Sequence, residues 1–202
     1  HGGQSVPNFD YAMAEGVKKT YRKQYFRALA QYIEVRFDMS ASDAAALTAA
    51  IKEALGTDVT MHTAEAYAEK LRAFLPRHQA ENGFQIITGD AARAAAEYAA
   101  KTAYKETDAA TYQAMEALVH NLNTMNSRAG AQVPFSSINY GTDTSPEGRM
   151  VIRNVLLATE AGLGNGETPI FPIHIFKVKE GVNFREGEPN YGLFKLACRV
   201  SA

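Results

Sequence analysis

Residues 121–142 have the sequence NLNTMNSRAGAQVPFSSINYGT, and this stretch decides the fold. It mixes the apolar residues Val133, Phe135 and Ile138 with a dense set of polar residues. The polar set comprises Asn121, Asn123, Asn126, Ser127, Arg128, Gln132, Ser136, Ser137 and Asn139. Polar groups on a buried strand need hydrogen-bond partners, and a polar substrate is one way to supply them. A hydrogen-bonded turn network, with Arg128 paired to a carboxylate, is an equally good interpretation.

Upstream of about residue 125 the chain is rich in alanine and predicts helices. Asp10 can cap a short turn, and a long helix is expected from about Val17 to Phe37. Three more helices are expected: from Ser40 or Ser42 to Leu55, from Thr63 to just before Pro76, and from Asp90 to about Leu122. The last could break near Thr107–Asp108. The many alanines indicate close helix packing rather than a coiled coil, since no heptad pattern is sustained.

Downstream of residue 125, helix and strand patterns alternate. A strand is expected over residues 131–139, where Pro134 indicates an edge or irregular position. Ser145-Pro146-Glu147 predicts a helix start, and that helix should reach about Ala161. The apolar run Ile170–Val178 is interrupted by Pro172, which favours a loop threaded into an interior over a regular strand. A last helix begins near Tyr191. The alternation predicts α/β packing with a sheet buried on both faces.

The bulk composition excludes several classes of protein. A net charge of −1 argues against a protein that coats nucleic acid or an anionic membrane, and no apolar run is long enough to span a membrane. The single cysteine, Cys198, cannot form an internal disulfide, which suits the reducing cytoplasm. At 46% hydrophobic residues the chain can bury the core of one domain. Because it opens without Met and ends within an expected helix, we expect an internal piece of a longer protein.

Common site motifs are absent or weak. The glycines of residues 162–166 are better explained by a helix C-cap and turn than by a dinucleotide-binding loop, because they follow a helix. The five histidines lack metal-ligand spacing, so no metal site is predicted in this chain. Cys198, without a nearby His or Asp in the sequence, is expected to be a small core residue.

Several segments together resemble the anaerobic (class III, glycyl-radical) ribonucleoside-triphosphate reductases. The resemblance rests on residues 121–142, Thr144–Arg149, Thr168–Pro172, Pro189–Tyr191, His1–Ser5 and Asn8–Tyr11. It implies a ten-stranded α/β barrel made of two antiparallel halves, with a finger loop through its centre. Residues 1–125 would form a mainly helical part of the barrel domain. Residues 126–202 would form a strand and finger-loop part of the same domain, with the finger at Ile170–Val178.

The resemblance also implies a chemistry and a set of partners. A glycyl radical, generated by an activase that uses S-adenosylmethionine and an iron–sulfur cluster, would pass its spin to a cysteine that attacks the ribose of a ribonucleoside triphosphate. The resemblance further implies a cytoplasmic homodimer that is regulated by dNTP and ATP effectors and binds zinc in a C-terminal part. Neither nucleic acid nor a membrane is expected as a partner. The radical glycine and the zinc-binding cysteines would lie outside this chain, so the chain alone should not turn over.

Site residues are carried over from the resemblance residue by residue. Where the family places a cysteine after Phe-Pro, this chain has Ile173 followed by His174; Cys198 is the available thiol, and Asn190 corresponds to an asparagine associated with formate as reductant. Substrate would be held by Arg128, Gln132, Ser136 and Ser137. An allosteric nucleotide would bind Lys18, Lys19 and Arg22, unless these simply form a solvated helix face. Two alternatives remain: another glycyl-radical enzyme, such as a pyruvate formate-lyase relative, and a non-catalytic nucleotide-binding or dimerisation module.

Overall fold

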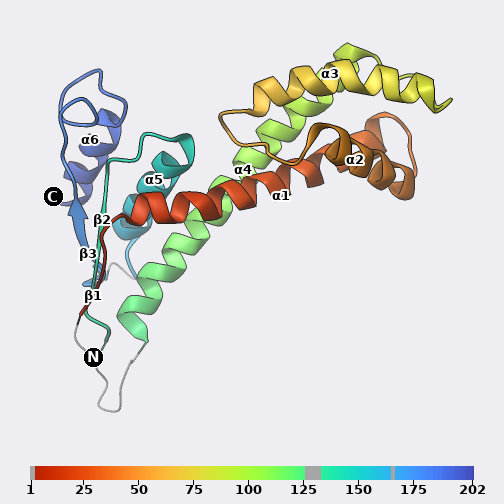
Figure 1. The fold of residues 1–202 in the computed structure, drawn as a ribbon. Coiled ribbons are helices and arrows are strands. Elements are labelled where there is room, and N and C mark those ends of the chain that lie inside the picture. The colour runs from red at the N-terminus through yellow and green to blue at the C-terminus, as the bar shows by residue number, and fades with distance from the viewer. Residues whose placement is uncertain (1–2, 126–132, 165–166) are drawn as a thin grey trace. The chain divides into compact units, whose positions relative to one another are not determined.

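A computed structural model describes residues 3–125, 133–164 and 167–202 (Figure 1). The fold is mixed α/β and rich in helix. The elements are β1 (Gln4–Val6), α1 (Phe9–Arg36), α2 (Ala41–Leu55), α3 (Ala64–Glu81), α4 (Gly89–Thr124), β2 (Ser136–Tyr140), α5 (Pro146–Ala161), β3 (Ile173–Phe176) and α6 (Tyr191–Val200). Contacts divide the chain into a helical unit, residues 18–107, and a sheet unit, residues 1–17 and 108–202.

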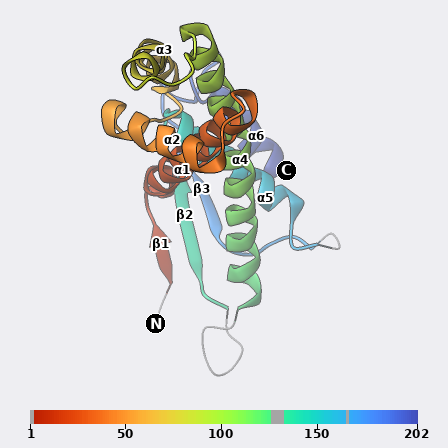
Figure 2. The same cartoon turned by 90° about the vertical axis from the view of Figure 1, so that its right-hand side faces the viewer.

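The helical unit contains α2, α3 and the parts of α1 and α4 between residues 18 and 107 (Figure 2). Its core joins large side chains of α1, such as Tyr25 and Leu29, to a row of small ones on α4. The small residues are Ala92, Ala95, Ala96, Ala99 and Ala103, each no more than 1% exposed. Alanine lets a neighbouring helix approach closely, so the close packing expected from the composition is confirmed.

Three helix boundaries differ from the sequence prediction. Helix α1 begins at Phe9 instead of Val17, and α4 continues through Thr107, which is fully buried. Helix α3 runs through Pro76 to Glu81. The predicted end before Pro76 is wrong because Leu75 and Gln79, on either side of the proline, are both buried and extend the apolar face. Burial of that face outweighs the roughly 3 kcal/mol cost of an internal proline. The predicted helix starts at Ser40 and Ser145 are confirmed, since each side chain accepts a backbone N–H three residues on.

The sheet unit is built on three parallel strands in the order β1-β2-β3. Residues Gln4–Val6 pair with residues 136–138, and residues 137–140 pair with Ile173–Phe176. Helix α5 connects β2 to β3, and α6 packs against α5. Of the two positions predicted for Pro134, the edge strand is wrong, because β2 lies in the middle of the three strands. The irregular position is confirmed, because the proline precedes β2. Proline there removes no hydrogen bond from the ladder.

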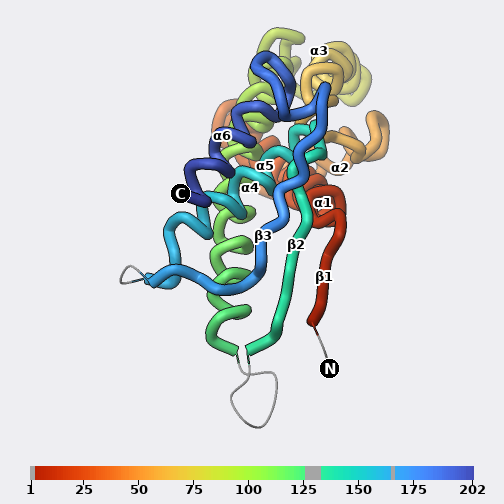
Figure 3. The backbone as a smooth tube through the Cα atoms, turned by 90° about the vertical axis from the view of Figure 1, so that its left-hand side faces the viewer, coloured from red at the N-terminus to blue at the C-terminus, as the bar shows by residue number. Residues whose placement is uncertain are grey.

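The two faces of this sheet differ. Figures 1 and 3 show α5 on one side of the strands, and the described part of the sheet unit leaves the other side open. The side chains of β2 point alternately to the two faces. Ser136, Ile138 and Tyr140 point to the covered face and are buried, whereas the two residues between them point to the open side and are half-buried. The expectation of a sheet buried on both faces is therefore wrong for the described residues. The expected loop over Ile170–Val178 is also wrong over Ile173–Phe176, because Pro172 precedes the strand instead of interrupting it.

Candidate functional site

The open face of the sheet brings together polar and aliphatic side chains from three segments that are far apart in the sequence. Register partners in parallel strands point to the same side, so Ser5, Ser137 and Ile173 form one row across the sheet. The next row pairs Asn139 with Ile175. We call these five residues the open face. Ile173 and Ile175 are 41% and 44% exposed, so the open face can receive another molecule or another part of a longer chain.

Asn139 contributes an unsatisfied group to the open face. Its Oδ1 atom is buried and has no hydrogen-bond partner among the described residues. A buried acceptor without a partner costs about 1–3 kcal/mol, so such a group is a candidate for binding a ligand or an ordered water. Asn139 belongs to the polar set of residues 121–142, but nothing in the sequence indicates its role.

The opposite, covered face holds a chain of hydrogen bonds centred on His174. Tyr140 Oη lies 2.8 Å from His174 Nδ1, and His174 Nε2 lies 3.1 Å from Thr159 Oγ1. The Thr159 hydroxyl donates to the Val155 carbonyl, so it accepts from Nε2–H, and Nδ1 accepts from the tyrosine. Burial lowers the pKa of His174 to about 4, which keeps the ring neutral. Burial also raises the pKa of Tyr140.

This geometry makes His174 a satisfied interior histidine that joins β3 to β2 and α5. It lies on the face opposite Ile173, because neighbouring strand residues alternate. Ser136 is also on the covered face; it is 9% exposed, and its hydroxyl has no partner among the described residues. Of the predicted site residues, the structure therefore brings Ser137 and Ile173 together on the open face and separates them from Ser136 and His174.

The turn after β2 is held by a buried carboxylate. Asp10, fully buried at the start of α1, accepts through Oδ2 the backbone N–H groups of residues 141, 142 and 143 at 2.9–3.1 Å. Gly141 adopts a φ of 122°, which favours glycine. A charged acceptor shared by three N–H groups is among the stronger arrangements of hydrogen bonds in proteins. The sequence signal was the segment Asn8–Tyr11, but it did not indicate which partner Asp10 has.

Two buried asparagines complete this turn. Asn183 Nδ2 donates to the carbonyls of Gly141 and Lys177, and its Oδ1 accepts from Lys179 N. Asn190 Nδ2 donates to the carbonyls of Gly141 and Asp143, while its Oδ1 is buried without a partner among the described residues. Asn190 thus lies at the carboxyl end of β2, just before α6. The sequence gives no signal for the role of Asn183, since nothing local distinguishes it from any other loop asparagine.

A further asparagine fixes the segment that leads into β3. Asn123, near the end of α4, accepts from the backbone N–H groups of Ile170 and Phe171 and donates to the Phe171 carbonyl. This bidentate contact explains one member of the polar set in residues 121–142 as structural. The turn-network interpretation of that set therefore holds for Asn123.

The cationic residues of α1 line a groove in the helical unit. This basic groove, of about 640 Å³, lies between α1 and α2. Its cationic side chains are Lys19, Arg22, Lys23, Arg27 and Lys52. Arg22 also pairs with Asp58 at 3.0 Å, and the Lys52 ammonium lies 4.9 Å from the centre of the Phe26 ring. The predicted Lys19 and Arg22 thus share one groove, whereas Lys18 is not among the residues that line it.

The other predicted site residues lie elsewhere. Cys198 is exposed on α6, contrary to the expectation of a core residue, because its position is on the solvent side of that helix. Arg128 and Gln132 lie outside the described residues. Within the described ranges, His, Cys, Asp and Glu form no group of three that could hold a metal. In the same ranges, no helix combines the length and apolarity needed to cross a membrane.

Comparison with known proteins identifies the family. The family model described as anaerobic ribonucleoside-triphosphate reductase matches residues 1–202, and the chain therefore belongs to this family. The chain is 36% identical over 92 residues to the anaerobic ribonucleoside-triphosphate reductase of Escherichia coli (strain K12), covering 45% of this chain and 13% of that relative. It is 38% identical over 101 residues to the protein of the same name from Enterobacteria phage T4, covering 50% and 16%. The chain thus matches only a small part of each of these relatives.

Proposed function

We propose that this chain is part of a cytoplasmic enzyme that reduces ribonucleoside triphosphates to deoxyribonucleotides by anaerobic radical chemistry. The observation that carries the proposal is the match of the reductase family model to all 202 residues. The open face supports it, because hydroxyl, amide and aliphatic side chains on rigid strands suit a sugar that must be held away from water.

We infer that the three strands belong to the α/β barrel implied by the resemblance, with the open face turned inward. Ser137 and Asn139 would then hydrogen-bond the ribose. Ile173, adjacent to Ser137, provides an apolar wall without redox chemistry, so the thiyl would come from a cysteine outside this strand. Asn190 would act as a positioning residue for the turn after β2, where its Nδ2 donates to the carbonyls of Gly141 and Asp143.

The radical glycine, zinc and activase cluster belong to other parts of the assembly in this proposal. The residues that the structure describes do not fit a metal ion, because no three His, Cys, Asp or Glu side chains among them lie close enough together to bind one. Zinc and the cluster are therefore assigned to a C-terminal part and to a radical-SAM activase. No step of the proposal requires this chain to hold either of them.

We also propose that the basic groove binds the phosphates of an effector dNTP or ATP in a homodimeric enzyme. Five cationic side chains around one groove favour an anion, and Arg22 and Arg27 can contact phosphate in a bidentate way. The competing view is a solvated helix face. In calorimetric titrations with dNTPs, Lys19→Ala/Arg27→Ala should weaken binding about tenfold or more. Lys101→Ala serves as the control, because Lys101 is an exposed residue of α4 that does not line the groove. If the unmodified protein, the double variant and this control bind dNTPs equally well, the basic groove is not the effector site.

The reductase proposal is tested on the full-length protein. Anaerobic reduction of CTP with activase and formate should occur, and Ser137→Ala and Asn139→Leu should each lower kcat/KM by about tenfold or more. Ser42→Ala, at an exposed helix position, should not change it. If the protein binds dNTPs but reduces no ribonucleotide, and both sheet variants bind them normally, the nucleotide-binding or dimerisation module is the better description.

A further inference from the structure

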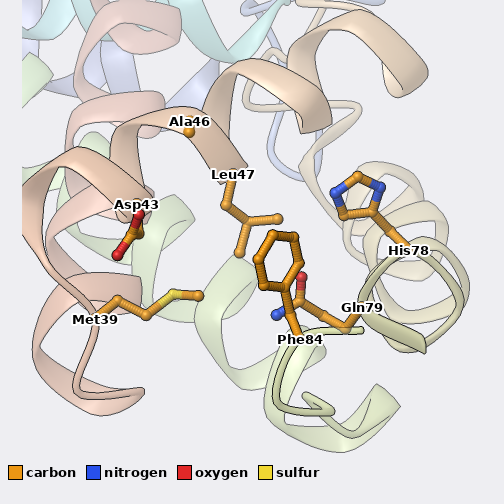
Figure 4. Close-up of a pocket in the computed structure, with 7 residues that line it drawn as sticks. All are labelled: Met39, Asp43, Ala46, Leu47, His78, Gln79 and Phe84. Atoms are coloured by element: carbon orange, nitrogen blue, oxygen red, sulfur yellow. The ribbon is translucent and has the colours of Figure 1, made fainter. Parts of the chain in front are cut away.

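The helical unit contains a second, mostly apolar cavity that the proposed reductase chemistry does not use. It measures about 240 Å³ and lies between α2 and the end of α3. Figure 4 shows the side chains that line it: Met39, Asp43, Ala46, Leu47, His78, Gln79 and Phe84. Because drug-sized ligands occupy pockets of about 300–1,000 Å³, this cavity suits a molecule of one or two fused rings.

Gln79 lines this cavity and carries an unsatisfied acceptor. The residue is 1% exposed, and its Nε2 donates to the Gln85 carbonyl at 3.0 Å. That bond fixes the orientation of the amide, since the reverse orientation would place two oxygens together. The Oε1 atom is buried without a partner among the described residues. A donor from a ligand would remove a penalty of about 1–3 kcal/mol.

The apolar walls of the cavity suit a flat ring. Phe84, from the segment between α3 and α4, is 58% exposed although it is a large aromatic side chain, and Leu47 on α2 is buried. The His78 ring stacks on Phe74 at 5.0 Å, which presents a second flat surface at the end of α3. A planar ligand between these side chains would bury apolar area that the described chain leaves exposed.

The charges around the cavity argue against an anion. Asp43 contributes a carboxylate, and among the described residues that line the cavity there is no Lys or Arg. A buried amide oxygen also favours an uncharged donor, because desolvating an unpaired cation costs far more than desolvating a neutral N–H group. The cavity therefore differs in kind from the basic groove, which collects five cationic side chains.

We propose that this cavity is a binding site for a small, uncharged, planar heteroaromatic molecule that donates one N–H hydrogen bond to Gln79 Oε1. Binding would connect α2 to the end of α3. Binding at this cavity does not require reductase activity, so it can be measured without turnover.

The test compares two ring systems of the same size in titrations of the full-length protein followed by NMR. Indole carries the N–H donor, and benzofuran has oxygen in its place. Indole should bind saturably with a Kd on the order of 0.1–1 mM, and benzofuran about tenfold more weakly. In Gln79→Leu the two should bind with nearly equal affinity. Ala46→Phe, which adds a ring to the lining of the cavity from an exposed helix position, should weaken indole binding more than about tenfold, whereas Ala49→Phe, exposed on α2 and outside the cavity, should not.

Three results would overturn the inference. The first is the absence of saturable indole binding. The second is equal affinity of the unmodified protein for indole and benzofuran, which would show that the ligand donates no hydrogen bond to Gln79. The third is unchanged binding in Ala46→Phe. If Gln79→Leu does not fold, the ligand pair and the two alanine variants still decide the question.

Discussion

Replacing Asp10 by asparagine should loosen the turn after β2 without changing its shape. In the native protein one carboxylate oxygen accepts three backbone N–H groups, and the other accepts from Tyr11 N at 3.1 Å. Hydrogen bonds to charged groups contribute about 1.5–3 kcal/mol each, against about 0.5–1.5 for neutral ones. Loss of the charge should therefore cost about 1 kcal/mol per bond, or about 3 kcal/mol for the three that converge on Oδ2.

Hydrogen exchange followed by mass spectrometry measures this loss locally. Amides of residues 141–143 in Asp10→Asn should exchange roughly 100-fold faster than in the unmodified protein, since 1.4 kcal/mol corresponds to a factor of ten. Asp90→Asn is the control, because Asp90 is 89% exposed and its contact with Arg72 contributes little. Exchange within about threefold of the native rate in Asp10→Asn would refute the view that this carboxylate holds the turn.

Three further substitutions test the sheet unit. A Cβ atom on Gly148 would overlap Asp143, so Gly148→Ala should lower the free energy of unfolding by about 2 kcal/mol in thermal melts. Adding Asp143→Gly should restore only part of it, because the Asp143 side chain also accepts from Ser145 N. Burial lowers the pKa of His174 from 6.5 to about 4, so between these pH values the folded protein binds fewer protons than the unfolded chain. The contribution of His174 to the free energy of unfolding should therefore be complete above about pH 6.5 and should fall by about 3 kcal/mol as the pH drops to 4. In His174→Phe this part of the pH dependence should disappear from urea titrations. Asn123→Leu should leave two backbone N–H groups without an acceptor and speed exchange in residues 170–171 by at least about tenfold, with no change in residues 141–143.

Local signals in the sequence predicted the parts of the fold that local physics determines. Ser40 and Ser145 cap helices, as expected, because a cap needs only the residue and the next few backbone groups. The effects of two prolines on the boundaries of helices and strands were predicted wrongly. Pro76 lies inside a helix and Pro172 lies just before a strand, and in both cases tertiary packing of neighbouring residues decides the outcome.

The polar centre of the sheet unit could not be predicted, because its hydrogen bonds join distant parts of the chain. Asp10 meets its partners more than 130 residues away, and Asn183 and Asn190 reach back more than 40 residues to the same turn. The sequence showed that polar residues gather near a strand. It did not show which of them satisfy one another and which keep a free group.

The alternation of side chains along β3 sharpens the question of the missing cysteine. Ile173 and His174 follow the Phe-Pro pair directly, but a strand turns neighbouring side chains to opposite faces, so they cannot serve the same site. His174 has both ring nitrogens engaged and a lowered pKa, which suits an interior brace better than a group that exchanges protons. Ile173 faces the same side as Ser137 and offers only an aliphatic surface. If the proposed substrate lies on the open face, the radical that attacks it would therefore have to arrive from a residue outside β3.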